Sequence, residues 1–184
     1  MAYYINMNTI IINASPRPKG NSSFLAAEFA AKYGNECKVV NLRDINMHSC
    51  QACRACRKND SLCIIDDDMK NLYHDLLNAE RIIFISPNYF GFLSSLGKIF
   101  TDRFYCLMNS SRVTKFEKGK KALFFLVQGA PSCDHGKNIG EWAKHFFTAF
   151  GFKFFTMTIP GCSTDNNDGV KNKLDEILMS ASMF

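Results

Sequence analysis

The stretch that decides the fold is residues 9–23, which read TIIINASPRPKGNSS. Its first part, Thr9 to Asn13, is too uniformly apolar for a strand with one solvent-facing side and is typical of a strand buried on both faces of a parallel sheet. A turn rich in Pro, Gly and Ser follows, and Asn21 or Ser22 can then cap a helix from about Ser23 to Tyr33. A buried strand joined to a helix by a short loop is the first half of a βαβ unit.

The same alternation continues along the chain. Parallel strands joined through helices need crossover connections, which are right-handed almost without exception. The sequence therefore predicts an α/β fold in one domain over residues 1–184, with an open, doubly wound parallel sheet of five strands in the order 2-1-3-4-5 and helices on both faces. The further strands are expected at Lys38 to Leu42, Arg81 to Ser86, Lys121 to Val127 and Phe152 to Ile159, and the further helices at about 66–78, 94–106, 137–150 and 168–180.

Composition narrows the class of protein. The chain has 184 residues, 47% of them hydrophobic and 21% charged, as in ordinary globular domains with one core. Its 17 Phe residues predict a largely aromatic core. The net charge of +5 comes without a run of Lys or Arg, which suits an anionic small molecule at least as well as nucleic acid. We expect no nucleic-acid partner.

Targeting and membrane segments are not visible in the sequence. Met1 to Asn8 is polar, and the apolar run Thr9 to Ile12 is too short for the core of a secretory signal. The longest low-charge stretch, Ile82 to Gly97, is interrupted by Ser86-Pro87-Asn88 and is too short to cross a bilayer. We therefore expect a cytoplasmic protein that does not bind membranes.

The strand order also locates the ligand. In open α/β sheets, ligands bind beyond the carboxyl ends of the strands where the order reverses, so the loops at 14–23, 87–92 and 128–132 should converge. The first loop ends at a helix N-terminus, which favours an anion. Three serines and an asparagine at a strand-to-helix turn suit a terminal phosphate held mainly by neutral donors. The patterns G-x-x-x-x-G-K-[ST] and G-x-G-x-x-G do not occur there, which disfavours nucleoside triphosphates and dinucleotides. The alternative is an ordinary Ser/Pro/Gly turn before a capped helix. The candidate donors and cations of the loop are Ser15, Arg17, Lys19, Asn21, Ser22 and Ser23.

The second loop, Pro87-Asn88-Tyr89-Phe90-Gly91, suits a flat ring. Tyr89 and Phe90 can supply stacking surfaces, and Asn88 with the backbone N–H groups of the loop can supply hydrogen-bond donors. Gly91 permits close approach of the backbone. The alternative is that Phe90 is a core residue and Tyr89 a surface aromatic.

Five short motifs occur in order along the chain: NASPR at 13–17, GNS at 20–22, DDDM at 66–69, SPNYFG at 86–91 and TDR at 101–103. In this order and spacing they resemble the NAD(P)H-dependent FMN reductase-like family, and most closely its iron–sulfur flavoprotein branch. The resemblance covers about Thr9 to Phe104. It implies a flavodoxin-like fold, tightly bound FMN, homodimers or homotetramers, and electron transfer through the flavin, with NAD(P)H as a transient donor.

The resemblance also assigns roles to individual residues. Asp102 and Arg103, on the helix after the ring loop, would serve packing or oligomer contacts and not catalysis. No acid–base residue is implied, because the chemistry takes place on the flavin. The implied phosphate contacts are Ser15, Arg17, Asn21, Ser22 and Ser23, and the implied ring contacts are Pro87, Asn88, Tyr89, Phe90 and Gly91.

A cysteine-rich loop at 48–65 holds four of the eight cysteines, Cys50, Cys53, Cys56 and Cys63. Their spacing allows ligation of a [4Fe–4S] cluster, although Ile64 and not Pro follows the fourth cysteine. Zinc is a rival ligand, but zinc ribbons usually separate two C-x2-C pairs by a longer insert. Free or disulfide-bonded thiols are the third alternative. The other four, Cys37, Cys106, Cys133 and Cys162, are expected to be buried small residues.

The resemblance implies that such a cluster exchanges electrons with FMN. Cluster-free reductases of the same family often keep some of these cysteines. The loop leaves the second strand, so we expect it on the same sheet edge as the phosphate loop and close to the flavin.

Three functions therefore stay open. The first is an FMN-dependent oxidoreductase that relays electrons between a cluster and FMN, and the second is a cluster-free NAD(P)H-dependent FMN, quinone or nitro-compound reductase. The third is a non-enzymatic, flavodoxin-like electron carrier. Such carriers are usually strongly acidic, and the net charge of +5 argues against that class.

Overall fold

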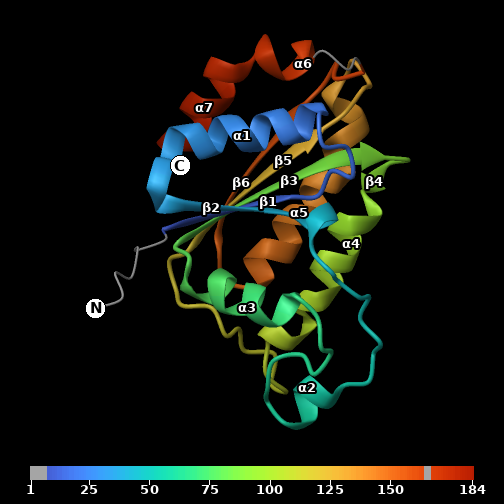
Figure 1. The fold of residues 1–184 in the computed structure, drawn as a ribbon, viewed down its shortest axis with the longest axis vertical. Coiled ribbons are helices and arrows are strands. Elements are labelled where there is room, and N and C mark those ends of the chain that lie inside the picture. Colours follow the sequence, from blue (N-terminus) through green and yellow to red (C-terminus); the bar gives the residue numbers. More distant parts are fainter. Residues whose placement is uncertain (1–7, 164–166) are drawn as a thin grey trace.

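The computed structural model describes residues 8–163 and 167–184. Residues 1–7, most of the segment searched for a secretory signal, lie outside this part. The described residues form an open sheet in the order β2-β1-β3-β5-β6 (Figure 1), and the neighbouring strands on this path are parallel. The predicted strand order is confirmed. The strands are β1 (Thr9–Asn13), β2 (Cys37–Asn41), β3 (Arg81–Tyr89), β5 (Lys121–Val127) and β6 (Lys153–Ile159), with β4 (Phe92–Leu93) antiparallel to the end of β3.

Helices cover both faces of the sheet, as predicted. In Figure 1, α1, α6 and α7 lie on one face and α3, α4 and α5 on the other. None of the helices in the described residues is long and apolar enough to cross a membrane. The helices are α1 (Asn21–Tyr33), α2 (Ala55–Lys58), α3 (Met69–Asn78), α4 (Ser95–Asp102), α5 (Lys137–Ala149), α6 (Asp168–Lys171) and α7 (Leu174–Met183), and short 3-10 turns include η2 (Leu42–Asp44), η3 (Arg103–Leu107) and η4 (Cys133–Gly136).

Successive residues of a strand belong to two separate hydrophobic cores, because side chains on a strand alternate between the faces of the sheet. Ile10 and Phe124 belong to the cluster under α3, α4 and α5, whereas Ile11 and Phe125 belong to the cluster under α1 and α7. The first cluster is strongly aromatic: Phe84 lies 5.5 Å from Phe124, measured between ring centroids. The aromatic core predicted from the Phe content is confirmed.

Several element ends differ from the sequence-based expectation. Neither Asn21 nor Ser22 caps α1: both lie in its first turn, and the cap position is Gly20, which has no side chain to bond with. The helix expected from residue 66 begins at Met69, whose N–H donates to Asp67 Oδ1 (3.1 Å) and so leaves Asp66 and Asp67 before the helix. The expected final helix is divided into α6 and α7.

The third strand is longer than predicted, and this changes the shape of the ring loop. β3 continues to Tyr89 and pairs with β4 in a hairpin whose two turn residues are Phe90 and Gly91. Their φ angles are 52° and 80°, as a type I′ turn requires. A bulky residue is uncommon at such a position, so the sequence carried no hairpin signal there.

Candidate functional site

The predicted phosphate loop is built around the buried side chain of Asn13 at the end of β1. The Asn13 amide donates to Ser23 Oγ (2.9 Å) and to Asn41 Oδ1 on β2 (3.0 Å). Its oxygen accepts from the backbone N–H of Ser15 (3.1 Å), and Ser15 Oγ accepts from the N–H of Arg17 (3.2 Å). These bonds hold the loop in a tight turn before α1.

The side chain of Ser23, unlike those of Ser15 and Ser22, does not line the small cavity beside this loop and bonds within the loop. Its hydroxyl donates to the Arg17 carbonyl (2.8 Å) and accepts from Arg43 (3.2 Å), in addition to its bond from Asn13. Ser15 and Ser22 instead line a small cavity. Ser23 thus stabilises the loop from outside that cavity.

This cavity, of about 70 Å³, lies where the sequence places the ligand. It brings together seven of the ten predicted FMN contacts and leaves out Ser23, Phe90 and Gly91. The lining residues are Ser15, Arg17, Gly20, Asn21, Ser22, Pro87, Asn88, Tyr89, Val127, Gln128, Gly129 and Cys162.

The third loop joins the ring loop through side-chain hydrogen bonds. Asn88 Nδ2 donates to Gln128 Oε1 (3.1 Å), and Gln128 Nε2 donates to the Ser132 carbonyl (2.7 Å). Asn88 Oδ1 accepts from the N–H of Gly91 and closes the hairpin (3.0 Å). The predicted convergence of the three loops is therefore present in the structure.

Cys162 is the residue of this site that the sequence analysis missed. It follows β6, its N–H donates to the Gln128 carbonyl (2.9 Å), and its carbonyl accepts from Asn21 Nδ2 (3.4 Å). Burial raises the pKa of its thiol to about 11, so the thiol is neutral at physiological pH. An isolated cysteine after the last strand gave no motif by which it could have been found.

The aromatic residues of the hairpin lie at its tip. Tyr89 is 40% exposed and Phe90 is fully exposed. The interpretation of Phe90 as a core residue is therefore wrong, because the left-handed turn directs its side chain into solvent. A ring bound against this hairpin would have one side open.

Ser94 connects the ring loop, the phosphate loop and α4. Its hydroxyl donates to the Ala14 carbonyl (2.6 Å) and accepts from the N–H of Gly97 as the cap of α4 (3.1 Å). Its own N–H donates to Ser86 Oγ (3.3 Å). A Cβ at Gly97 would lie 3.3 Å from the Ala14 Cβ, so α4 packs directly on the phosphate loop.

The donor set of the cavity fits an FMN phosphate. Hydroxyls of Ser15 and Ser22, the Asn21 amide and the Arg17 guanidinium surround the N-terminus of a 13-residue helix, where anions are stabilised. The cavity is large enough for a phosphate but far smaller than the several hundred Å³ that enclose a whole cofactor. The ring would have to lie outside it, against the hairpin.

The cysteine-rich loop runs between η2 and α3 and contains α2. Cys56 is buried, Cys63 is half-buried, and Cys50 and Cys53 are exposed. Burial raises the pKa of the Cys56 thiol, and the neighbouring Cys63, Cys53 and Cys50 raise it further. Within residues 8–163 and 167–184, however, His, Cys, Asp and Glu side chains form no group of three or more close enough to hold a metal ion.

The four cysteine thiols of this loop are the ligands that a [4Fe–4S] cluster requires, so the donor chemistry fits such a cluster. The base of the loop contacts Arg103 at the C-terminal end of α4, whereas the N-terminal end of α4 adjoins the phosphate loop. An eight-residue helix is about 12 Å long. In Figure 1, α2 lies at the lower end of the molecule, well below β4.

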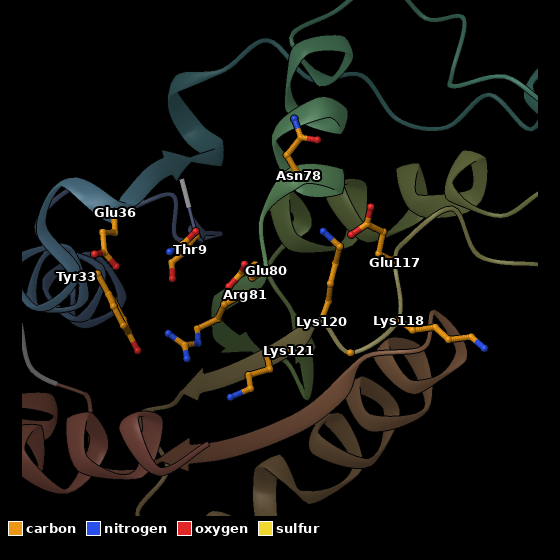
Figure 2. A pocket seen from close by; sticks show the side chains of 12 residues that line it. Thr9, Tyr33, Glu36, Asn78, Glu80, Arg81, Glu117, Lys118, Lys120 and Lys121 are labelled. Carbon is orange, nitrogen blue, oxygen red and sulfur yellow. The ribbon is translucent and has the colours of Figure 1, made fainter. Parts of the chain in front are cut away.

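A larger cavity, of about 580 Å³, lies at the opposite edge of the sheet. Figure 2 shows residues that line it, among them Thr9, Arg81 and Lys121, the first residues of β1, β3 and β5. Charges of both signs line it, and the Arg81 guanidinium lies 5.3 Å from the centre of the Tyr33 ring. Ligands of doubly wound sheets bind at the carboxyl ends of the strands, so we assign the candidate site to the smaller cavity.

This fold defines a flavodoxin-like α/β protein with a polar first loop at the carboxyl edge of its sheet. The NADPH-dependent FMN reductase family model matches residues 7–164, and the chain belongs to that family. Membership confirms the family that the sequence motifs resemble.

Curated relatives include an iron–sulfur flavoprotein of Methanocaldococcus jannaschii, 36% identical over 100 residues, and one of Archaeoglobus fulgidus, 34% identical over 100 residues. The aligned part is 53% of this chain in both cases, and 51% and 48% of the respective relatives. The chain thus spans about half the length of these relatives. Among solved structures, an FMN-dependent NADH-azoreductase from Bacillus anthracis in complex with FMN is similar in fold, with a TM-score of 0.69 at 16% identity over 95% of this chain and 98% of that one.

Proposed function

We propose that this chain is an FMN-dependent oxidoreductase that holds the FMN phosphate in the cavity of the β1–α1 loop and the ring against the β3–β4 hairpin. The observation that carries the proposal is this cavity, where Ser15, Asn21 and Ser22 from one loop meet Asn88 and Tyr89 from another. FMN, when bound, supplies redox chemistry in one- and two-electron steps.

The protein residues bind and orient the cofactor. Ser15, Ser22 and Asn21 donate to the phosphate oxygens, and Arg17 and the α1 N-terminus offset their charge. Pro87 and Asn88 fix the edge of the ring, and Gln128 holds the Asn88 amide in place. Because the site binds FMN and leaves the ring accessible, NAD(P)H and an acceptor can each approach the exposed face in turn.

The open side of the ring also bears on assembly. We infer that a second copy of the chain covers part of the hairpin, with Phe90 and Tyr89 in the interface, in a homodimer or homotetramer. A stable interface buries on the order of 1,200 Å² or more in total. The protein is proposed to be a single-domain, cytoplasmic protein whose partners are small molecules or a redox protein, and not nucleic acid.

For Cys50, Cys53, Cys56 and Cys63 we propose [4Fe–4S] ligation and electron exchange with FMN. The similarity of this chain to iron–sulfur flavoproteins of Methanocaldococcus jannaschii and Archaeoglobus fulgidus supports this. A second candidate is a cluster-free NAD(P)H-dependent FMN, quinone or nitro-compound reductase. The exposure of Cys50 and Cys53 and the separation of the thiols favour it.

Substitution of two serines tests the phosphate site. Ser15→Ala with Ser22→Ala removes two hydrogen bonds to a charged group, each contributing about 1.5–3 kcal/mol. The FMN dissociation constant should rise about a hundredfold to ten-thousandfold. The matched control is Ser110→Ala with Ser111→Ala, two exposed serines remote from the cavity, which should leave affinity unchanged. Unchanged affinity in the first variant would refute the assignment.

Iron and sulfide analysis with an absorption spectrum, on protein purified without oxygen, separates the two candidates. With a cluster, Cys56→Ser abolishes the cluster absorbance while FMN binding survives. Cys133→Ser is the control, because Cys133 lies outside the loop and is exposed, against the expectation that it is buried. Iron-free protein that turns over NAD(P)H with quinones or free flavin identifies the cluster-free reductase instead.

A further inference from the structure

The two ends of the cysteine-rich loop are bonded to each other. At its base, the N–H of Asp68 donates to the Asn46 carbonyl (3.0 Å), and the N–H of Asn46 donates to Asp68 Oδ2 (2.7 Å). One step inward, the N–H of His48 donates to Asp67 Oδ2 (3.0 Å). Residues 48–67, which include all four cysteines of the motif, thus leave and rejoin the fold at one place.

Arg103 binds both ends of this loop with one side chain. Its Nη1 donates to the His48 carbonyl (2.7 Å) and to Asp67 Oδ2 (2.5 Å), and its Nη2 donates to Asp67 Oδ1 (3.0 Å). Its Nε donates to the Tyr73 hydroxyl of α3 (3.2 Å). The side chains of Arg103 and Asp67 are both 0% exposed. This is a bidentate pair, whose planar geometry fixes orientation as well as distance.

The same pair connects the loop to the flavin site. Arg103 directly follows α4, and Ser94 at the start of α4 donates to the Ala14 carbonyl of the phosphate loop. One short, capped helix therefore has the phosphate loop at one end and the base of the cysteine loop at the other. Arg103 thereby joins the base of the cysteine loop to that helix.

Further attachments of the loop are made nearer its apex, where Cys56 and Cys63 pack against the core and Arg57 donates to the Asn109 carbonyl. Lys115 Nζ donates to the carbonyls of Asp60 (3.0 Å) and Ser61 (3.1 Å), and the Arg57 guanidinium lies 4.3 Å from the centre of the Tyr105 ring. They restrain the tip but not the base. A buried ion pair is a weak source of stability compared with apolar packing, and its best-attested use is to fix one arrangement among several.

We propose that Arg103 and Asp67 are positioning residues: they set the place of the four-thiol loop relative to the flavin site before any metal is bound. This inference rests on the proposed function, in which the four thiols ligate a [4Fe–4S] cluster. Neither Arg103 nor Asp67 lines the small cavity. Besides each other, their side chains bond to the His48 backbone, the Tyr73 hydroxyl and the N–H of Met69.

The test uses a double variant, Asp67→Leu with Arg103→Met, which removes both charges together so that neither is left buried alone. Arg103→Lys keeps the charge but lacks the planar fork, and serves as the conservative variant. The matched control is Lys98→Ala with Asp102→Ala, an exposed ion pair one turn earlier on α4.

The first measurement needs no metal. In reduced, metal-free protein, the alkylation rate of Cys56 by iodoacetamide is followed by mass spectrometry. We expect at least a tenfold increase in the double variant, an intermediate rate in Arg103→Lys and no change in the control. FMN affinity should stay within about twofold of wild type, because the flavin cavity is untouched.

The second measurement is spectroscopic. Each protein is reconstituted with iron and sulfide without oxygen, and the electron paramagnetic resonance spectrum of the reduced form is recorded. A positioning role predicts an altered spectrum and a lower iron content in the double variant, with partial recovery in Arg103→Lys.

A folded double variant whose Cys56 is protected as in wild type would overturn the proposal. If the double variant does not fold, Arg103→Lys decides by the same labelling rate: a rate equal to wild type overturns the proposal, and a raised rate supports it. Failure to bind FMN or iron in the wild-type protein would contradict the proposed function alone, because the labelling experiment depends on neither.

Discussion

Replacing Ser94 by Ala should weaken both the fold and the flavin site. Ser94 is buried, and its hydroxyl makes two bonds: one to the Ala14 carbonyl of the phosphate loop (2.6 Å) and one from the N–H of Gly97 (3.1 Å). Alanine keeps the backbone bond to Ser86 but loses both hydroxyl bonds. The two losses can be estimated separately.

Loss of a helix N-cap costs about 1 kcal/mol. Ala14 is 0% exposed, and a buried carbonyl that loses its donor costs about 1–3 kcal/mol more. Together Ser94→Ala should lower the free energy of unfolding by about 2–4 kcal/mol. FMN binding must then also order the freed loop, at about 1 kcal/mol, so its dissociation constant should rise about fivefold.

Urea unfolding of FMN-free protein measures the first effect, and titration of FMN followed by flavin fluorescence measures the second. Ser95→Ala is the matched control, because Ser95 is the exposed neighbour in the same helix and should change either quantity little. If Ser94→Ala is as stable as Ser95→Ala and binds FMN equally well, Ser94 does not connect α4 to the phosphate loop.

Two further substitutions test other parts of the structure. Burial raises the pKa of Asp67, but hydrogen bonds from Arg103, His48 and Met69 outweigh burial and hold this pKa below the ordinary 3.8. The ionised Asp67 carboxylate therefore stabilises the fold above pH 3.8, and this stabilisation is lost as the pH falls below 3.8. Urea midpoints measured between about pH 5 and about pH 2.5 should fall more steeply in wild type than in Asp67→Asn. Phe90→Asn should raise the stability of the FMN-free chain by up to about 1 kcal/mol, because Asn tolerates the left-handed conformation better; a loss of stability on urea unfolding would mean that the exposed Phe90 ring makes stabilising contacts.

Much of the fold could be predicted from local features of the sequence. The apolar run at β1, its counterparts at β3 and β5 and the helices between them determine a doubly wound sheet, since parallel strands need crossovers of one hand. The composition of the β1–α1 loop and its place at a helix N-terminus indicate a phosphate site. Seven of the ten predicted FMN contacts line one cavity for this reason.

Only the tertiary structure decided the rest. Asp67 and Arg103 are 36 positions apart, and their pairing depends on how α3 and η3 pack against each other. In the same way, Cys162 reaches the cavity only because β6 lies beside β5. The hairpin at Phe90 opposes its local conformational preference, and the base of the cysteine loop is bonded to Arg103 from another part of the chain. Periodicity and turn composition act over a few residues, whereas these contacts join segments far apart in the chain, and so the sequence motifs alone could not show them.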